Sequence, residues 1–358
     1  MTTGQSLAKL AVATLVAVAV VLAGPADVRA ADVHEPVSIA AFPVGDSFDP
    51  GERAEEFATS DAGPASAMCS ELCPSNTWQV TADVLFLQRR DPAAAVLIAS
   101  SLDGAELLNA GDFDFGVEPG FDLSLTYRFD DRFAIQARYF GVDHWNARSA
   151  AATAPDSLLQ VNASPPVFAW AGTGIQSEST SALQNAELNA QRRVLERWTL
   201  LAGFRYAELD ERFSAGLVAA DIPFHYETAT RNRLYGGQLG VGVLLWDRGG
   251  PLTVQAEGKA GIFGNAAAQD SAYDTGVVAV AARGSGSQTA FLGEIGLLGD
   301  CCLTSRWSLR GGYRLLWIDG VALATDQVAA SDFVSNRGMN TIGDAFYHGA
   351  FVGIQYVR

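Results

Sequence analysis

The stretch "LRGGYRLLWIDGVALATDQV", residues 309–328, decides the fold. Every second residue from Leu309 to Trp317 is apolar, aromatic or glycine, whereas the alternate positions begin with Arg310 and Arg314. A period of two predicts a β-strand whose two faces differ in polarity. In a water-soluble protein the charged face would meet solvent and the apolar face would meet a core. The rest of the chain decides which arrangement applies here.

The same alternation recurs along the chain in runs of nine to thirteen residues. The other runs are 78–86, 121–129, 132–140, 186–194, 198–206, 235–246, 252–263, 290–299 and 346–358. Together with the opening stretch they predict about ten strands, and twelve are possible. A strand that crosses a bilayer needs about 9–11 residues, so each run is long enough to do so.

Short and long connections alternate between these runs. Short ones follow Phe129, Val194, Trp246 and Gly299. The predicted long loops are 88–111, 142–183, 209–230, 264–287 and 319–344. Short periplasmic turns, long external loops and an even strand number are typical of outer-membrane barrels, and an all-β membrane protein must close because an open edge in lipid leaves backbone groups unpaired. The sequence therefore predicts an all-β, antiparallel, up-and-down transmembrane barrel with external loops.

In such a barrel the apolar face meets lipid and the arginines face the lumen. The alternative is a soluble β-sandwich or lipocalin-like barrel, whose polar faces would be rich in Lys, Glu and Thr. Here the second face is rich in glycine with isolated charges, which favours the membrane barrel. Aromatic residues near many strand ends, such as Trp78, Trp198 and Trp317, are typical of interfacial girdles.

The N-terminus predicts export. Lys9 precedes an apolar run at residues 10–24, and Val28-Arg29-Ala30 places small residues at −3 and −1, so we expect a signal peptide over 1–30. An uncleaved anchor helix is the alternative, but the run is shorter than the roughly 20 residues a spanning helix needs. Residues 31–76 are rich in Ala, Pro and acidic residues without periodicity and predict a flexible periplasmic extension. Residues 77–358 are then expected to form the barrel. We expect the barrel to lie in the outer membrane, with membrane lipid as its partner.

Charge restricts the function. The net charge of −16 argues against a nucleic-acid partner. Charged residues on the predicted inner face have both signs, which suits a cross-linked and mostly filled lumen. The predicted lumen charges are Arg128, Arg138, Arg205, Glu257, Lys259, Glu294, Arg310 and Arg314, with Asp83 and Asp122 also facing inward. We expect Arg205, Arg310 and Arg314 to pair with inward carboxylates such as Glu257 and Glu294.

The four cysteines form a candidate disulfide site. Cys69 and Cys73 precede the first strand, and Cys301 and Cys302 lie in a predicted short turn, so all four are expected in the oxidising periplasm. One or two bridges from the extension to the turn are expected. A local Cys69–Cys73 bridge and thiolate–metal binding are alternatives, although the spacing matches zinc sites poorly.

No catalytic constellation is identifiable. His34 lies in the extension, His144 and His225 fall in or beside long loops, and His348 begins the last strand. Four carboxylates are expected at comparable depth: Asp143, Glu227, Asp319 and Asp344. A hydrolase at the barrel rim is therefore one alternative. Metal ligation by Asp143, His144 and His348 is another. Loop His and Asp residues are common, however, and we expect no catalytic site, no metal and no cofactor.

Several strings also carry a family resemblance. "NRLYGGQLGVGVLLWDRGG", "EGKAGIFGN", "GEIGL", "LRGGYRLLWIDGVALATDQ" and "FYHGAFVGIQY" resemble blocks of the BBP7-type outer membrane β-barrel proteins of planctomycetes, as do "TADVLFLQRR" and "AGFRYAELDE". The resemblance spans roughly residues 78–358 and implies an exported outer-membrane barrel, without an activity assigned to any residue.

Two function classes follow from the strand number. About eight strands leave an interior filled by side chains, whereas about sixteen leave an aqueous channel. Ten strands favour a structural or loop-presenting barrel at the cell surface. A narrow porin-like channel for small solutes is the alternative.

Overall fold

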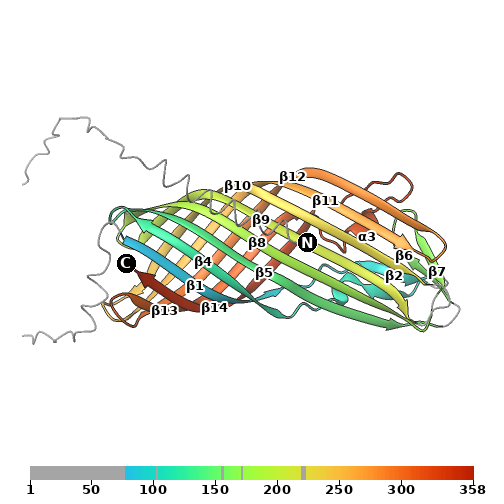
Figure 1. Cartoon of the computed structure of the whole chain (residues 1–358), viewed down its shortest axis with the longest axis horizontal. Coiled ribbons are helices and arrows are strands. Elements are labelled where there is room, and N and C mark those ends of the chain that lie inside the picture. The colour runs from blue at the N-terminus through green and yellow to red at the C-terminus, as the bar shows by residue number, and fades with distance from the viewer. Residues whose placement is uncertain (1–76, 102–103, 155–156, 171, 219–222) are drawn as a thin grey trace, which may run out of the picture. The chain divides into compact units, whose positions relative to one another are not determined.

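The chain folds into a closed antiparallel barrel of ten strands (Figure 1). The computed structural model describes residues 77–101, 104–154, 157–170, 172–218 and 223–358. The barrel strands are β1 (Thr77–Arg89), β4 (Val117–Arg128), β5 (Phe133–Ala152), β8 (Gly174–Leu195), β9 (Trp198–Val218), β10 (His225–Asp247), β11 (Leu252–Asp274), β12 (Ala279–Cys302), β13 (Trp307–Val321) and β14 (Gly343–Val357). Barrel strands that follow one another along the chain are neighbours, and β1 closes the ring against β14. The predicted up-and-down barrel is confirmed.

The chain divides into two units, residues 1–63 and 64–358, and the described residues all belong to the second. The predicted signal peptide (1–30) and flexible extension (31–76) lie outside the described residues. No helix among the described residues is long and apolar enough to cross a membrane.

The two ends of the barrel differ. Four short turns, at 129–132, 196–197, 248–251 and 303–306, lie at one end, together with Thr77 and Arg358. We call this the turn end and the opposite end the cap end. The cap end contains the short strands β2 (Val96–Ser100), β3 (Glu106–Asn109), β6 (Leu158–Val161) and β7 (Val167–Trp170), and the helices η1 (Ala110–Asp112) and α3 (Gln327–Ala330).

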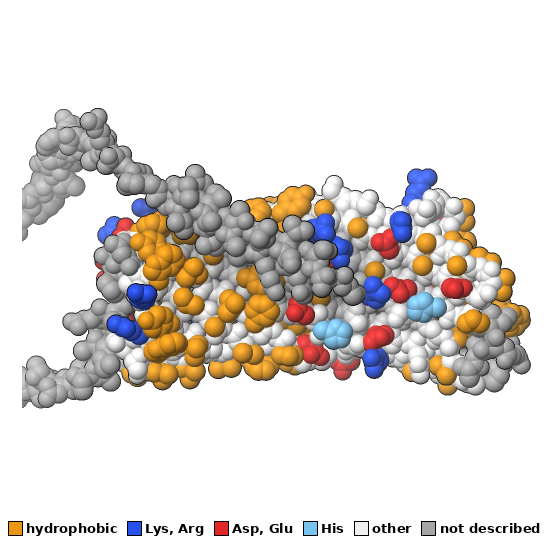
Figure 2. Space-filling model, viewed as in Figure 1, with side chains coloured by type: hydrophobic (Ala, Val, Ile, Leu, Met, Phe, Trp, Pro, Cys, Tyr) orange, Lys and Arg blue, Asp and Glu red, His pale blue; other side chains and the backbone are white. Residues whose placement is uncertain are grey.

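The turn-end half of the barrel has an apolar outer surface between two aromatic belts. On β13, Leu309, Tyr313 and Trp317 are exposed, whereas Arg314 and Leu316 are buried, so the apolar face of the opening stretch points outward. The turn-end belt comprises Trp78, Tyr127, Phe129, Phe133, Trp198, Trp246, Trp307 and Tyr356. The cap-side belt comprises Phe86, Phe121, Tyr139, Tyr206, Tyr235, Phe291, Trp317 and Phe346. Figure 2 shows hydrophobic side chains over the turn-end half and charged ones over the other.

The spacing of the belts fits a bilayer. Tyr235 and Trp246 lie eleven residues apart on β10. At roughly 3.3 Å per residue this is about 36 Å of strand, or about 28 Å along the axis at the usual tilt of about 40°. The apolar band of an outer-membrane barrel is about 25 Å tall.

The prediction of long loops at 142–183, 209–230 and 264–287 is wrong for most of their length. β12 is 24 residues long and β10 and β11 are 23, about twice what a bilayer requires. Beyond the cap-side belt these strands reverse their polarity. On β9, Leu209 and Phe213 are buried inside, and Asp210 and Arg212 face out. The strands continue into water with an apolar interior, as in a soluble β-sheet.

The cap-end half of the wall is incomplete, and a second sheet fills its opening. β13, β14, β1 and β4 end near the cap-side belt, so residues 279–290 of β12 pair only with β11. A four-stranded sheet in the order β3-β2-β6-β7, here called the cap sheet, lies in this half (Figure 1). Its Ile98, Leu159 and Val161 pack against Ala215 and Phe224 at the cap ends of β9 and β10. The predicted loops 88–111 and 142–183 thus contain a folded cap.

Candidate functional site

Seven charged side chains from seven different strands meet inside the barrel at the level of the apolar band. This charge cluster consists of Asp122 (β4), Arg138 (β5), Glu187 (β8), Arg205 (β9), Lys259 (β11), Glu294 (β12) and Arg314 (β13). All seven are buried. Inward-facing side chains from different strands meet because a barrel of ten strands has a narrow interior.

Arg138 is the centre of the charge cluster. Its guanidinium contacts Asp122 at 2.8 Å, Glu187 at 2.9 Å and Glu294 at 2.8 Å. Asp122 and Glu187 lie on the two strands beside β5, whereas Glu294 reaches it from the opposite wall. Arg138 therefore ties the two sides of the barrel together across the lumen.

The remaining cations complete this link. Arg205 contacts Glu294 at 2.9 Å, and Arg314 contacts Asp122 at 2.7 Å and Glu294 at 3.1 Å. Lys259 contacts Glu187 at 3.1 Å and the half-buried Glu257 at 2.7 Å. Four cations thus meet four carboxylates, and their formal charges cancel. Such neutrality matters because a buried charge without a partner costs several kcal/mol.

Amides and an aromatic ring surround the charges. Gln238 on β10 donates to Glu187 at 2.9 Å and to Asn189 at 2.8 Å. The Phe140 ring lies 4.7 Å from the guanidinium carbon of Arg138 and 5.6 Å from that of Arg314. These contacts fill the space that an aqueous pore would need.

The other predicted lumen charges lie nearer the turn end. Arg128 donates to Gln79 at 3.1 Å. Arg310 lies 3.6 Å from Asp83 and 3.7 Å from Asp300, not beside Glu257 or Glu294. Glu187 was absent from the predicted set, although its inward position on β8 could be read from the phase of that strand.

A cavity of about 200 Å³ opens at the turn end and stops at the charge cluster. Arg128, Gln191, Leu201, Gln255 and Glu257 are among its lining residues. A small void of about 10 Å³ beside Lys259, Glu294 and Arg314 is no larger than a single water site. Access from the turn end therefore ends within the apolar band.

An apolar layer lies on the cap side of the charge cluster. It is formed by inward side chains with 2% exposure or less: Leu87, Leu209, Leu234, Phe263, Leu292, Leu316 and Ile318. These residues come from six strands and form part of the hydrophobic core. The layer excludes water above the charges.

The β13–β14 connection, residues 322–342, folds into the barrel above this layer, and we call it the plug. The Asn232 side chain on β10 accepts from the Ala322 amide at 2.8 Å and donates to the Ala322 carbonyl at 2.8 Å. Gln269 on β11 donates to Ser331 Oγ at 3.1 Å. The predicted loop 319–344 is thus an inward plug, because its Ala-, Leu- and Val-containing segment buries against the wall.

One buried ion pair anchors the plug. Glu211 on β9 accepts from Arg89 on β1 at 2.5 Å and from the Ala324 amide at 3.0 Å. Arg89 is 2% exposed and stacks on Phe115, with its guanidinium carbon 4.5 Å from the ring centre. Neither charged residue was predicted, since both fall at or beyond the predicted strand ends.

The plug also contains a pH-sensitive carboxyl group. Burial, together with the Glu211 and Asp344 carboxylates and against the opposing charge of Arg89, raises the pKa of Asp326 to about 6. A raised pKa in the docked plug means that docking favours protonated Asp326. Docking is therefore strongest near pH 4, weakens as the pH rises through 6, and changes little above it.

We predict that hydrogen exchange of the plug amides, corrected for the intrinsic pH dependence of exchange, is faster at pH 7.5 than at pH 5. Asp326→Asn should slow exchange at pH 7.5 and remove this difference between the two pH values, because asparagine cannot ionise. Equal corrected rates in the wild-type protein at both values would contradict the prediction.

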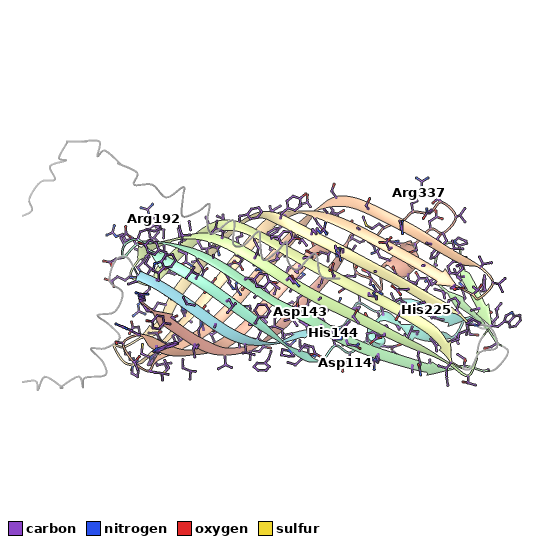
Figure 3. All side chains as sticks on the ribbon, viewed as in Figure 1. Asp114, Asp143, His144, Arg192, His225 and Arg337 are labelled. Atoms are coloured by element: carbon purple, nitrogen blue, oxygen red, sulfur yellow. The ribbon has the colours of Figure 1, made fainter. Side chains whose placement is uncertain are left out.

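The histidines do not converge. His144 lies on β5 beside Asp143, and His225 lies on β10, nearer the cap end (Figure 3). His225 has Glu227 at 3.6 Å, and His348 on the outer face of β14 contacts Tyr313 at 2.7 Å. β1 and β4 separate β14 from β5, so the structure does not bring His348 together with Asp143 and His144. Among the described residues no group of three His, Cys, Asp or Glu side chains could hold a metal ion.

The cysteines are partly described. Cys301 is a free thiol, and Cys302 is disulfide-bonded. Both are the last residues of β12, whereas the prediction placed them in the turn itself, which the structure has at 303–306. Cys69 and Cys73 lie outside the described residues, so the predicted bridge from the extension stays a prediction that non-reducing peptide mapping can test.

The chain is similar to several solved bacterial proteins at low sequence identity. It is similar to the outer membrane protease OmpT from Escherichia coli, with 11% identity, 80% of this chain and 98% of that chain covered, and a TM-score of 0.46. It is also similar to the translocator domain of the autotransporter NalP from Neisseria meningitidis, with 11% identity, 82% and 92% coverage and a TM-score of 0.37. The toluene transporter TodX from Pseudomonas putida shows 12% identity, 83% and 92% coverage and a TM-score of 0.30.

The chain has the fold of an outer-membrane β-barrel. At these identities the likeness concerns the fold alone. No family profile and no curated protein sequence matches the chain. The resemblance to the BBP7-type family therefore stays a prediction.

Proposed function

We propose that this protein is a sealed outer-membrane barrel that displays a rigid cap outside the cell. The turn-end half supplies the membrane anchor, with an apolar surface between two aromatic belts. The strands β8 to β12 continue beyond it as a stiff support, and the cap sheet and plug form the outer end. The role of such a molecule is structural or adhesive.

The observation that carries the proposal is the filled lumen. Three levels follow one another from the turn end: the charge cluster, the apolar layer and the plug. Solute passage would require the ion pairs of Arg138 to break and the apolar layer to separate, which together cost many kcal/mol. The narrow-channel alternative has one observation in its favour, the cavity at the turn end, but that cavity stops at the charge cluster.

Conductance in planar bilayers tests this proposal. The purified barrel, shown to be folded by the gel shift between unheated and heated samples, is expected to give no stable current steps. Regular steps from the wild-type protein would favour the channel. A membrane-impermeant maleimide supplies a second readout on intact cells, in a Cys301→Ser background. Val277→Cys, at an 82% exposed position between β11 and β12, should be labelled, and Thr304→Cys at the turn end should not.

Export and family membership are parts of the same proposal. The predicted signal peptide would direct the chain through the inner membrane, and the mature protein would begin at Ala31. N-terminal sequencing of the protein from outer-membrane fractions tests this directly. An N-terminus at Met1 would contradict it. We further propose that the chain is a member of the BBP7-type barrels, on the sequence blocks quoted above.

A further inference from the structure

An arginine accompanies an outward aromatic residue at every turn of the turn end. Arg132 precedes Phe133, Arg197 precedes Trp198, and Arg306 precedes Trp307. In the fourth turn Arg248 follows Trp246 by two residues, and Arg358 follows Tyr356 in the same way. With Arg192 and Arg193 at the end of β8, these residues make an exposed arginine rim directly outside the turn-end belt: Arg132, Arg192, Arg193, Arg197, Arg248, Arg306 and Arg358.

The arginine rim differs from the arginines of the cap end in its partners. On the outer face of the cap-end half, arginines pair with carboxylates, as Arg212 does with Glu227 at 2.7 Å, Arg231 with Asp210 at 2.9 Å and Arg283 with Asp270 at 2.8 Å. Within the described part of the chain, no member of the arginine rim forms an ion pair. Arg132 interacts electrostatically with the nearby Asp130, but the rim still offers guanidinium groups that are not held in close ion pairs.

The carboxylates at this end do not offset the rim. The exposed ones are Asp130, Asp131, Glu196 and Asp247, four against seven arginines. Asp130 accepts the amides of Arg132 and Phe133, both at 2.7 Å, and Asp247 accepts the Gly249 amide at 2.9 Å, so these two stabilise their turns. In a chain of net charge −16, the turn end carries a local excess of positive charge.

Arg192 and Arg248 direct the rim toward the membrane interface, whereas Arg132, Arg193 and Arg197 lie at the mouth of the turn-end cavity. The guanidinium carbon of Arg248 lies 4.0 Å from the centre of the Trp246 ring, which faces outward in the turn-end belt. Arg192 pairs in register with Phe133 of the same belt and projects from the barrel at the turn end (Figure 3). Arginine stems pack on apolar surface while their heads stay in the polar layer, so Arg192 and Arg248 lie at headgroup depth.

We propose that the arginine rim binds the phosphate groups of anionic phospholipids in the leaflet that surrounds the turn end. The planar guanidinium can donate two parallel hydrogen bonds to a phosphate, and the belt beside it would meet the acyl chains of the same molecules. Free phosphate would gain only the first of these contacts. The inference rests on the proposed membrane location, and it adds a preferred lipid class and a fixed insertion depth.

Brominated lipids provide the test, because they quench tryptophan only when they contact it. Four of the seven tryptophans, at positions 78, 198, 246 and 307, lie in the turn-end belt. The full-length barrel is reconstituted in vesicles of brominated phosphatidylcholine mixed with unbrominated phosphatidylcholine or phosphatidylglycerol. If unbrominated phosphatidylglycerol lowers the quenching more than unbrominated phosphatidylcholine does, the barrel prefers phosphatidylglycerol, and the difference measures that preference. Membrane insertion is measured separately by quenching in pure brominated phosphatidylcholine and by the heat-dependent gel shift.

The wild-type protein should prefer phosphatidylglycerol severalfold, since each arginine near a membrane surface contributes up to about fivefold. The triple variant R192Q/R248Q/R306Q should approach equal affinity for the two lipids. The matched control R212Q/R231Q/R283Q, which removes the same charge from the cap end, should keep the wild-type preference. Salt at about 0.5 M should weaken the preference, because it screens exposed charges.

Three results would overturn the inference. One is an inserted wild-type barrel without lipid preference. Another is a preference that the control loses and the triple variant keeps. A third is that inorganic phosphate displaces phosphatidylglycerol from the barrel more than chloride of equal ionic strength does. The rim would then be a general phosphate site. If the triple variant does not fold, the lipid preference of the wild-type protein and its dependence on salt still test the inference. A barrel that folds in detergent yet fails to insert would instead contradict the proposed function.

Discussion

Replacing Arg138 with glutamine is expected to lower the free energy of unfolding by about 3–5 kcal/mol, the usual cost of leaving buried charges without a partner. Arg138 contacts Asp122, Glu187 and Glu294 at 2.8–2.9 Å, and all four side chains are buried. Without the guanidinium, three cations face four carboxylates, so one negative charge is left unbalanced in a space that water reaches poorly. The temperature at which the compact gel band converts to the unfolded band should fall by many degrees.

The control for this prediction is Arg231→Gln. Arg231 also pairs with a carboxylate, Asp210 at 2.9 Å, but its side chain is 53% exposed on the outer face. Surface pairs contribute about 0–1 kcal/mol, so the conversion temperature should barely move. A similar small change for Arg138→Gln would mean that the charge cluster is solvated, and the channel alternative would gain support. Arg314→Gln, which removes two ion pairs instead of three, should have an intermediate effect.

The charge cluster shows how far alternation alone can reach. Arg138, Arg205, Lys259, Glu294 and Arg314 could each be placed inside because their strands have one clearly apolar face. Which residues pair depends on strand stagger and on the tilt of the barrel, neither of which alternation determines. Glu187 is not among the predicted lumen charges because the run 186–194 is more polar than the others, although Ala186, Leu188 and Ala190 mark its outer face.

The lengths of the strands could not be predicted from the apolar face. The outward face loses its apolar character at the cap-side belt, which looked like the end of each strand. The alternation in fact continues with reversed polarity, as Leu209 and Phe213 against Asp210 and Arg212 show on β9. When a strand passes from lipid into water, its outward face must become polar and its inward face can become apolar. A pattern that requires an apolar outward face therefore predicts a loop at that point.

The cap sheet and the plug depend on contacts between distant segments. Ser164, between β6 and β7, accepts from the Phe333 amide of the plug at 3.0 Å and donates its own amide to Ser331 at 3.0 Å. The strands of the cap sheet are four or five residues long, too short to show a clear period. Their sequences predict loops because these segments become ordered only by packing into the incomplete wall of the barrel.

The plug gives the second large expected effect. Glu211→Gln should release the plug while the transmembrane part of the barrel stays folded. Arg89 would then be a buried cation whose one ionic partner among the described residues is gone. Such a loss costs about 3–5 kcal/mol, and the plug can avoid it by undocking and admitting water. Cleavage within 322–342 by an added protease should therefore become at least about a hundredfold faster, since each 1.4 kcal/mol corresponds to roughly tenfold.

Two further variants show whether the ion pair is responsible. Glu227→Gln removes a carboxylate that pairs with Arg212 at 2.7 Å on the outer face, and it should leave plug cleavage unchanged. The double variant Arg89→Leu with Glu211→Leu removes both charges from the buried site, and replacing a buried pair with apolar side chains is often neutral or stabilising. The double variant should therefore resist cleavage far better than Glu211→Gln. If both are cleaved equally fast, Glu211 acts through its hydrogen bond to the Ala324 amide and the charge of Arg89 is immaterial. If neither differs from the wild-type protein, the plug is retained by the Asn232 and Gln269 contacts alone.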